Sequence, residues 1–176
     1  LAAGWDASGL VAGRGAAKVS TVLFAVDALT ATAEEAVAEG AQLLITHHPL
    51  LLRGAKFIPD SDYKGNVLHT LIEGGCGLLG AHTNADAAVE GVNEALCDAI
   101  GLIDREPLTE AQTQVLDEQE HAVGTGRLGT LPEELTLKEL AERLAAALPA
   151  TAGGLRIAGR ADQPIRRVAL CGGAGD

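Results

Sequence analysis

The sequence has few aromatic residues and few basic ones. Aromatic side chains make up 2% of it, and 24 acidic residues outnumber 13 basic ones, which gives a formal net charge of -11. Surfaces that bind nucleic acid or anionic membranes need clustered Lys and Arg, and nucleic-acid surfaces often add aromatic side chains that stack on bases. The composition therefore argues against nucleic acid and against membranes as partners.

Cysteines and long apolar runs are also scarce. The three cysteines are odd in number and have no C-x-x-C spacing, so the sequence predicts neither a disulfide framework nor a zinc knuckle. A reducing cytoplasm is then the simplest setting. No stretch approaches the roughly 20 continuous apolar residues of a membrane span, and no signal-peptide pattern opens the chain. We therefore expect a cytoplasmic protein that has no membrane span.

Hydrophobic residues nevertheless make up 47% of the 176 residues, which is enough for one packed α/β domain or for two small ones. In the first hundred residues, short apolar runs alternate with amphipathic segments. The runs predict buried strands and the segments predict helices, a combination typical of βαβ units with a parallel sheet. The predicted strands are residues 19–26, 42–46 and 76–82, and the predicted helices are residues 30–40, 61–75 and 87–102.

Local signals predict the ends and the buried faces of these helices. Thr32 is the expected N-cap of the first helix, and Gly40 stands at its C′ position. Apolar residues at helical spacing define the buried faces of the other two. These residues are Val67, Leu68, Leu71 and Ile72 in one helix, and Val89, Val92, Leu96, Ala99 and Ile100 in the other.

The pattern changes at about residue 105. Residues 104–121 are polar and predict a connector or an exposed hairpin arm. Beyond them, the sequence predicts a strand, a helix that runs from an N-cap at Thr136 to Pro149, and strands in residues 154–159 and 166–172. We therefore predict a first α/β domain, residues 1–104, followed by residues 105–176, which contain the connector and the start of a second α/β domain.

The fold class that follows is α/β, with two linked three-layer units and mostly parallel sheets. The chain begins without an initiator Met and stops directly after a strand-like run, "VALCGGAGD". We therefore expect it to be a fragment in which the second unit is truncated at its C-terminal end.

Two clusters of polar residues follow predicted strands. His47 and His48 come after the second strand in "LLITHHPLLLRG", and His82 and Asp86 come after the third in "AHTNAD". The carboxyl ends of parallel strands are where ligands bind in open α/β sheets. Imidazole with carboxylate suits first-row metals such as Zn, Mn or Fe. Adjacent strand residues point to opposite faces, so two ions roughly 3.5–4 Å apart fit His47 and His48 better than one ion does.

The same residues also have purely structural interpretations. A histidine pair near a strand end can belong to an ordinary loop, His82 can cap the following turn, and Asp86 can be the N-cap of the helix that begins near Ala87. Trp5 and Asp6 are interpreted as a packing residue and a turn residue. The residue pattern alone leaves both kinds of interpretation open.

Four stretches together are similar to one known family. They are "GWDASGLVAG", "LLITHHPLLLRG", "GAHTNADAAVEGVNEALCDAIGL" and "RRVALCGGAGD". In their order and spacing they resemble the Nif-three-like dinuclear-metal-centre proteins, which are often named GTP cyclohydrolase 1 type 2 homologues. The resemblance spans nearly the whole chain. It implies two linked α/β domains per subunit, a toroidal homohexamer, and two divalent transition-metal ions such as Zn, Mn or Fe.

The resemblance also implies roles for individual residues. By position, His47 and His48 match the family's histidine pair, and Asp86 matches the aspartate of its H-T-x-x-D block, so these three are expected metal ligands. His82 begins that block, lies close to the metals in the family, and is our candidate catalytic residue. A further histidine and glutamate ligand are expected C-terminal to Asp176. The short connection after Gly101 is typical of the compact form of the family, which has no inserted domain.

Two functions agree with this resemblance. The first is a metal-dependent hydrolase that acts on a small, phosphorylated or nucleotide-like substrate. The second is a non-catalytic metal-binding scaffold or regulator that acts through a hexameric ring. Neither the metal nor the substrate is given by the sequence.

Overall fold

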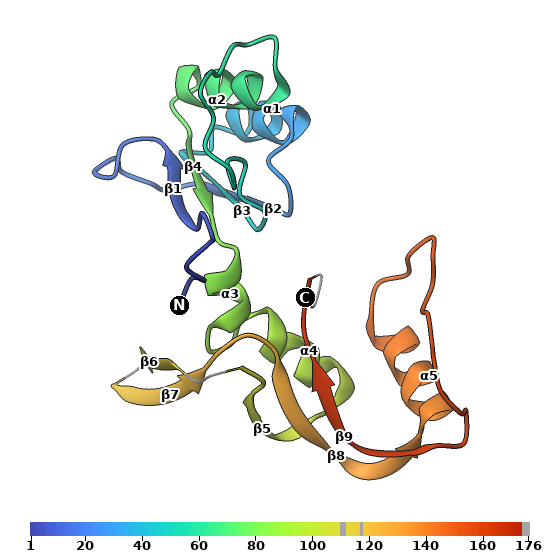
Figure 1. Cartoon of the computed structure of the whole chain (residues 1–176). Coiled ribbons are helices and arrows are strands. Elements are labelled where there is room, and N and C mark those ends of the chain that lie inside the picture. Colours follow the sequence, from blue (N-terminus) through green and yellow to red (C-terminus); the bar gives the residue numbers. More distant parts are fainter. Residues whose placement is uncertain (110–111, 117, 174–176) are drawn as a thin grey trace. The chain divides into compact units, whose positions relative to one another are not determined.

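The computed structural model describes residues 1–109, 112–116 and 118–173 and divides the chain into two compact units (Figure 1). The first unit comprises residues 2–85, and the second comprises residues 86–176 together with Leu1. The change of pattern at residue 105 lies inside the second unit, and the domain boundary after residue 104 stays a prediction. Among the described residues, no helix is long and apolar enough to cross a membrane.

The first unit is built on a four-stranded sheet with the strand order β1-β4-β3-β2. Its strands are β1 (Gly9–Ala12), β2 (Val22–Ala25), β3 (Leu43–Thr46) and β4 (Gly77–Gly80). Strands β2, β3 and β4 run parallel, whereas β1 pairs with β4 in the antiparallel direction. The mixed α/β class and the mostly parallel first sheet are therefore confirmed, and β1 is an addition that the sequence did not predict.

Helices α1 (Thr30–Ala38) and α2 (Tyr63–Glu73) connect the parallel strands. They lie side by side (Figure 1) and share one apolar core with the sheet. The buried residues of this core include Ala33, Ala36, Leu44, Val67, Leu68, Leu71 and Leu78. This packing accounts for the two crossovers, because each helix buries its apolar stripe against the same sheet.

Two details of these helices differ from the sequence predictions. Helix α1 begins at Thr30 with Leu29 as its N-cap, so Thr32 lies inside the first turn and is not the cap. Ile72 was expected on the buried face of α2, but it is 57% exposed. Gly40 does follow α1 with a φ of 67°, the left-handed conformation that glycine adopts most easily at this position.

The sheet of the first unit is apolar on its other face as well. Val22 and Phe24 of β2 stand in register with Leu43 and Ile45 of β3, and Leu79 of β4 continues the row. Phe24 is 74% exposed within the part of the chain that the structure describes. Strands that are apolar on both faces are typical of parallel sheets covered on both sides.

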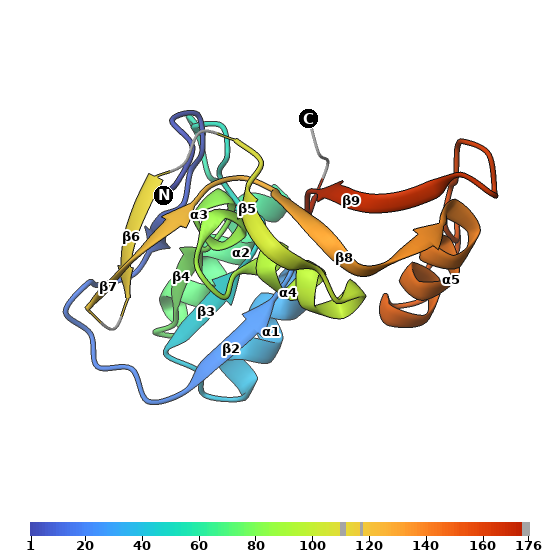
Figure 2. The ribbon, with the colours of Figure 1, turned by 90° about the horizontal axis from the view of Figure 1, so that it is seen from below.

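The second unit is a mixture of helices and antiparallel strands. A sheet with the order β5-β8-β9 is formed by β5 (Ile103–Pro107), β8 (Arg127–Thr136) and β9 (Pro164–Leu170), as Figure 2 shows. A separate hairpin is formed by β6 (Gln112–Leu116) and β7 (Gln119–Val123), which agrees with the hairpin alternative for the later part of residues 104–121. Both pairings in the three-stranded sheet are antiparallel, so extending the parallel pattern to this unit was wrong.

Helix α5 (Leu137–Ala147) has the N-terminus that the sequence predicted. Thr136 Oγ1 accepts from the Glu139 N–H, and the Glu139 carboxylate accepts from the Thr136 N–H, which is a complete capping box. The predicted strand at residues 154–159 is absent, because these described residues form an irregular loop. Gly154 (φ 58°) and Gly159 (φ 130°), at the two ends of this segment, both have positive φ values.

The buried face of helix α4 (Val92–Ile100) agrees with the predicted one only at Ile100. Its buried residues are Asn93, Cys97 and Ile100, whereas Val92 is 38% exposed. Asn93 can be buried because its amide donates to the Asp86 carbonyl at 2.8 Å and accepts from the Gly172 N–H at 2.7 Å. A polar residue thus holds α4 in place where an apolar face was expected.

A buried arginine joins α4 to β8. The Arg127 side chain is 1% exposed, and its Nε donates to Glu94 Oε1 at 2.5 Å. The same guanidinium donates to the carbonyls of Gly124 and Gly126, and Arg105 donates to the other oxygen of Glu94 at 3.0 Å. Burial by itself raises the pKa of Glu94, but the hydrogen bonds and charges of Arg127 and Arg105 hold that pKa below its usual range.

We expect Glu94→Gln to lower the free energy of unfolding by about 3 kcal/mol near neutral pH, because it leaves a buried cation without its carboxylate. Denaturant unfolding of the two proteins measures this difference. Because the pKa of Glu94 is lowered in the folded state, its stabilisation is present above the unfolded pKa of about 4.3 and is lost as pH falls through the folded pKa. The difference should therefore shrink below about pH 4.

Glu133→Gln is the matched control for this prediction. Glu133 pairs with Arg143 at 3.2 Å, but its side chain is 70% exposed, so its removal should cost less than about 1 kcal/mol. The free energy of unfolding is compared between the wild type and Glu94→Gln at each pH. If their difference stays constant from pH 7 to pH 3, the stabilisation does not come from the Glu94 carboxylate.

Candidate metal centre

The two histidine-bearing loops meet at one edge of the first sheet. Beyond the ends of β3 and β2 the parallel ladder continues, because the N–H groups of His47 and His48 donate to the carbonyls of Ala25 and Val26 at 3.2 and 2.9 Å. On the other side of β3, the Ala81 N–H donates to the Thr46 carbonyl at 2.8 Å. These backbone hydrogen bonds bring the residues that follow β2, β3 and β4 together at one edge of the sheet.

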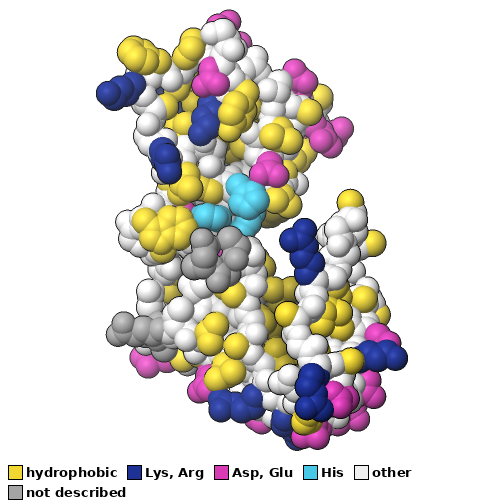
Figure 3. Space-filling model, turned by 45° about the vertical axis from the view of Figure 1, so that its right-hand side comes forward, with side chains coloured by type: hydrophobic (Ala, Val, Ile, Leu, Met, Phe, Trp, Pro, Cys, Tyr) yellow, Lys and Arg dark blue, Asp and Glu magenta, His cyan; other side chains and the backbone are white. Residues whose placement is uncertain are grey.

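Three imidazole rings form a cluster there. The ring centroids of His47 and His48 are 5.1 Å apart, and those of His82 lie 5.2 Å from His47 and 5.9 Å from His48. Figure 3 shows histidine side chains gathered in one surface patch. The His48 side chain is 53% exposed and that of His82 is 17% exposed. The edge of the sheet therefore presents imidazole groups to solvent.

Each imidazole is held at Nδ1 by an oxygen. The Nδ1 atom of His47 lies 3.0 Å from the Ala81 carbonyl oxygen, and that of His48 lies 2.7 Å from Asp27 Oδ1. Carbonyl and carboxylate oxygens only accept, so Nδ1 carries a proton, and in the neutral form of each ring the lone pair is on Nε2. Metal-binding histidines typically show this arrangement, in which the second nitrogen donates to a carboxylate or a backbone carbonyl. The hydrogen bonds at Nδ1 of His47 and His48 therefore have the form that metal-binding histidines use.

The third histidine is held by a buried aspartate. His82 Nδ1 lies 2.8 Å from Asp6 Oδ1, and the Asp6 side chain is 0% exposed. Burial by itself raises the pKa of Asp6, but hydrogen bonds from Ser8, Thr83, His82 and the Ala7 N–H together hold it well below its usual range. Asp6 is therefore a carboxylate at neutral pH, and His82 donates to it.

All 176 residues match the model of a protein family described as Duf34/NIF3 (NGG1p interacting factor 3). The chain belongs to the NIF3 family. It is 48% identical over 172 residues to the GTP cyclohydrolase 1 type 2 homolog of Streptomyces coelicolor, which covers 98% of this chain and 59% of the relative. The chain thus spans 59% of the length of that relative.

Other members of the NIF3 family extend the comparison. The GTP cyclohydrolase 1 type 2 homolog of Mycobacterium tuberculosis is 30% identical over 276 aligned positions, which cover 100% of this chain and 72% of the relative. That alignment is longer than the chain itself, and the compact form stays a prediction. A NIF3-related protein of Bacillus cereus has the same fold, with a TM-score of 0.84, 24% identity, and coverage of 99% of this chain and 72% of that one.

Three of the four residues predicted as a site lie close together within the first unit. His47, His48 and His82 belong to the first unit and cluster, whereas Asp86, in α3 (Thr83–Ala87), is the first residue of the second unit. Within the described parts of the chain, no group of three or more His, Cys, Asp or Glu side chains is arranged to hold a metal ion. The metal ligands His47, His48 and Asp86 therefore stay a prediction.

Asp6 and Asp27 are members of the cluster that sequence reasoning missed. Asp27 directly follows the first predicted strand, so the rule that drew attention to His47 also applied to it. Asp6 was interpreted as a turn residue, and it does accept from the Ala7 N–H at 2.7 Å, but it also binds His82. Its position precedes a strand whose pairing the sequence did not predict.

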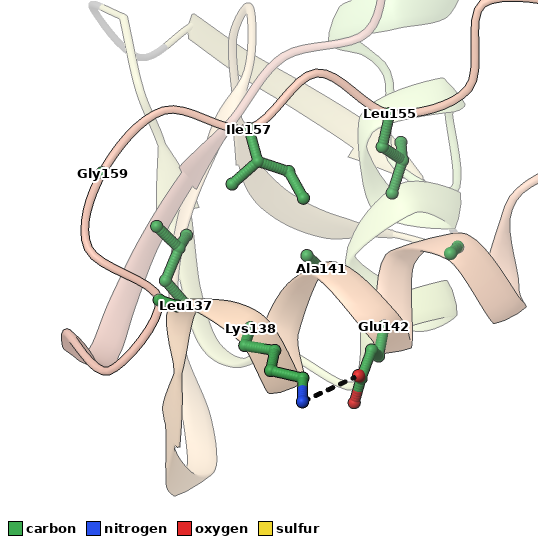
Figure 4. Close-up of a pocket in the computed structure, with 9 residues that line it drawn as sticks. Leu137, Lys138, Ala141, Glu142, Leu155, Ile157 and Gly159 are labelled. Atoms are coloured by element: carbon green, nitrogen blue, oxygen red, sulfur yellow. Dashed lines mark ion pairs between the residues drawn. The ribbon is translucent and has the colours of Figure 1, made fainter.

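An apolar pocket in the second unit lies apart from these residues in the sequence and offers a different chemistry. It has a volume of about 410 Å³ and lies between α5 and residues 155–161. In Figure 4, Leu137, Leu155 and Ile157 line it, and the ion pair between Lys138 and Glu142, at 3.9 Å, lies at one side. No histidine or cysteine lines this pocket, so it does not supply the ligands that transition metals prefer.

Proposed function

We propose that the complete protein binds two divalent transition-metal ions and hydrolyses a small, phosphorylated or nucleotide-like substrate. The observation that carries this proposal is the cluster of three imidazoles, each held at Nδ1 by a protein oxygen. That arrangement keeps the lone pairs on Nε2, the nitrogen with which such histidines bind metal or accept a proton.

His47 and His48 would each bind one ion of the pair, because the oxygens that hold their rings come from opposite neighbours of β3. Ala81 follows β4, and Asp27 follows β2. Asp86 would supply a carboxylate, and a histidine and a glutamate C-terminal to Asp176 would complete the set. A pair of ions held there would supply a water molecule of lowered pKa and a polarised substrate. His82 would accept a proton at Nε2.

The names of relatives and metal chemistry support the proposed substrate class. Relatives at 48% and 30% identity are named GTP cyclohydrolase 1 type 2 homologs. Attack of water on a purine ring carbon or on a phosphoester is compatible with such a site. We also propose a cytoplasmic location, which suits the three free cysteines, Cys76, Cys97 and Cys171.

Two measurements on the complete protein test the proposal. The first is metal analysis, and the second is turnover of a panel of nucleotides and phosphoesters with added Mn²⁺ or Zn²⁺. We expect up to two ions per subunit and hydrolysis of at least one member of the panel. A protein without bound metal would contradict the proposal. Metal without turnover would favour the alternative, a non-catalytic metal-binding scaffold or regulator that acts through a hexameric ring.

We expect the complete protein to be a homohexamer. The first unit exposes an apolar sheet face that includes Phe24, and aromatic residues make up only 2% of the whole chain, so contacts with further protein should contribute much of the stability. Light scattering coupled to size-exclusion chromatography measures the assembly. A stable monomer at micromolar concentration would contradict the expectation.

A further inference from the structure

Asp6 and His82 form a carboxylate-imidazole pair within the first unit. The side chains are 0% and 17% exposed, and Asp6 Oδ1 lies 2.8 Å from His82 Nδ1. The two residues are 76 positions apart in the sequence. Because both are largely removed from water, their hydrogen bond is screened less than a bond at the surface would be.

The Asp6 carboxylate is fixed by donors on both oxygens. Oδ1 accepts from the Ala7 N–H at 2.7 Å and from His82, whereas Oδ2 accepts from Ser8 Oγ at 2.6 Å. Oδ2 also accepts from Thr83 Oγ1 at 2.5 Å and from the Thr83 N–H at 3.1 Å. A carboxylate with this many donors presents only an acceptor to His82, so the proton of the neutral imidazole must be on Nδ1.

We propose that Asp6 is a positioning residue for His82, which it holds in the Nδ1–H tautomer so that Nε2 carries the lone pair used in hydrolysis. This inference rests on the proposed function. In the reaction, the O–H bond of the attacking water breaks, its proton passes to Nε2, and its oxygen forms a bond to the substrate. The leaving group departs with the bonding electron pair and takes up the proton from Nε2. Between these two proton transfers, the Asp6 carboxylate stabilises the imidazolium form of His82.

The Nδ1–H tautomer of His82 explains why the isosteric substitution Asp6→Asn should lower the rate of hydrolysis. In Asp6→Asn, the amide oxygen should occupy the Oδ2 position, where three donors from Ser8 and Thr83 converge. The amide nitrogen then faces His82 Nδ1, which must become an acceptor. The proton of the imidazole moves to Nε2, and the lone pair needed for proton transfer is lost.

The tautomer can be measured on the complete protein without any turnover. Magic-angle-spinning ¹⁵N NMR of the metal-free protein, labelled in its histidine rings, distinguishes protonated from unprotonated Nδ1 and Nε2, and His82→Gln identifies the His82 signals. We expect protonated Nδ1 in the wild type and protonated Nε2 in Asp6→Asn. Ser8→Ala is the matched control, because it removes one donor from Oδ2 and leaves the Oδ1 contact to His82 in place.

In the metal-loaded protein, Asp6→Asn should lower kcat by about 10²-fold or more with little change in KM or metal content. Ser8→Ala should stay within about threefold of the wild type. A wild-type His82 with its proton on Nε2 would overturn the inference even if Asp6→Asn failed to fold. A folded Asp6→Asn protein with the wild-type tautomer or rate would also overturn it. Absence of turnover in the wild type would count against the proposed function instead, since the tautomer is read independently.

Discussion

Replacing His47 and His48 together by alanine should remove most of the bound metal from the complete protein. The Ala81 carbonyl holds the His47 ring at Nδ1, and Asp27 holds the His48 ring in the same way. The double variant therefore removes two Nε2 atoms that are already oriented to bind metal. Loss of an orienting partner alone typically costs 10–100-fold in metal affinity, and loss of two ligands should cost more than about 100-fold. Elemental analysis and titration of the metal-free protein with Zn²⁺ measure this loss.

The single variants and an unrelated histidine sharpen this experiment. Because the oxygens that hold His47 and His48 come from opposite neighbouring strands, each single variant should weaken mainly one ion of the pair. His69→Ala is the matched control, since His69 is an exposed residue of α2 whose Nε2 lies 3.1 Å from the Ile58 carbonyl oxygen. The site assignment is wrong if the double variant keeps the wild-type metal content, or if His69→Ala loses as much metal as the double variant does.

The rule that located the histidine cluster is a property of parallel strands. Apolar runs bounded by turn residues predicted β2, β3 and β4, and helical spacing predicted the crossovers between them. Once the strands are parallel, the residues after their carboxyl ends must share one edge. His47, His48 and His82 therefore followed from the sequence, and Asp27 followed from the same rule although it was not identified.

Asp6 could not be predicted in this way, because it depends on a pairing between distant segments. Strand β1 is only four residues long and runs antiparallel to β4, with Gly9 opposite Gly80. An antiparallel partner enters the sheet at the edge where the parallel strands leave it. The residues before β1 therefore arrive beside the residues after β4, and no local pattern in the sequence specifies that register.

The sequence did not predict the antiparallel sheet of the second unit, for a related reason. A strand, a helix and another strand in succession indicated a parallel crossover around α5. Residues 148–163 instead return along the helix, so that the N–H groups of Leu137 and Lys138 donate to the carbonyls of Gln163 and Ala161 at 2.9 and 3.1 Å. Strand β9 consequently begins opposite Thr136, the end of β8, and must run in the opposite direction.

Asp86→Asn and His82→Gln should separate metal binding from turnover in the complete protein. A carboxylate that binds a metal contributes negative charge directly to the cation, so Asp86→Asn keeps the shape of the side chain but removes the attraction that holds the ion. We expect its metal affinity to fall by more than about 10-fold. His82→Gln should instead keep metal content near that of the wild type and lower the hydrolytic rate by about 10²-fold or more, because it removes a proton acceptor.

The two variants should be measured side by side, by metal titration and by turnover, with Asp98→Asn and His69→Gln as matched controls. Asp98 is a carboxylate of α4 that is 70% exposed and pairs with Arg105, and His69 is an exposed residue of α2. Neither control should change metal affinity or rate by more than about twofold. Equal loss of metal in His82→Gln and Asp86→Asn would make His82 a metal ligand, with Asp6 as the partner that orients it. If Asp86→Asn binds metal as the wild type does, Asp86 is not a metal ligand and its role is structural, within the helix.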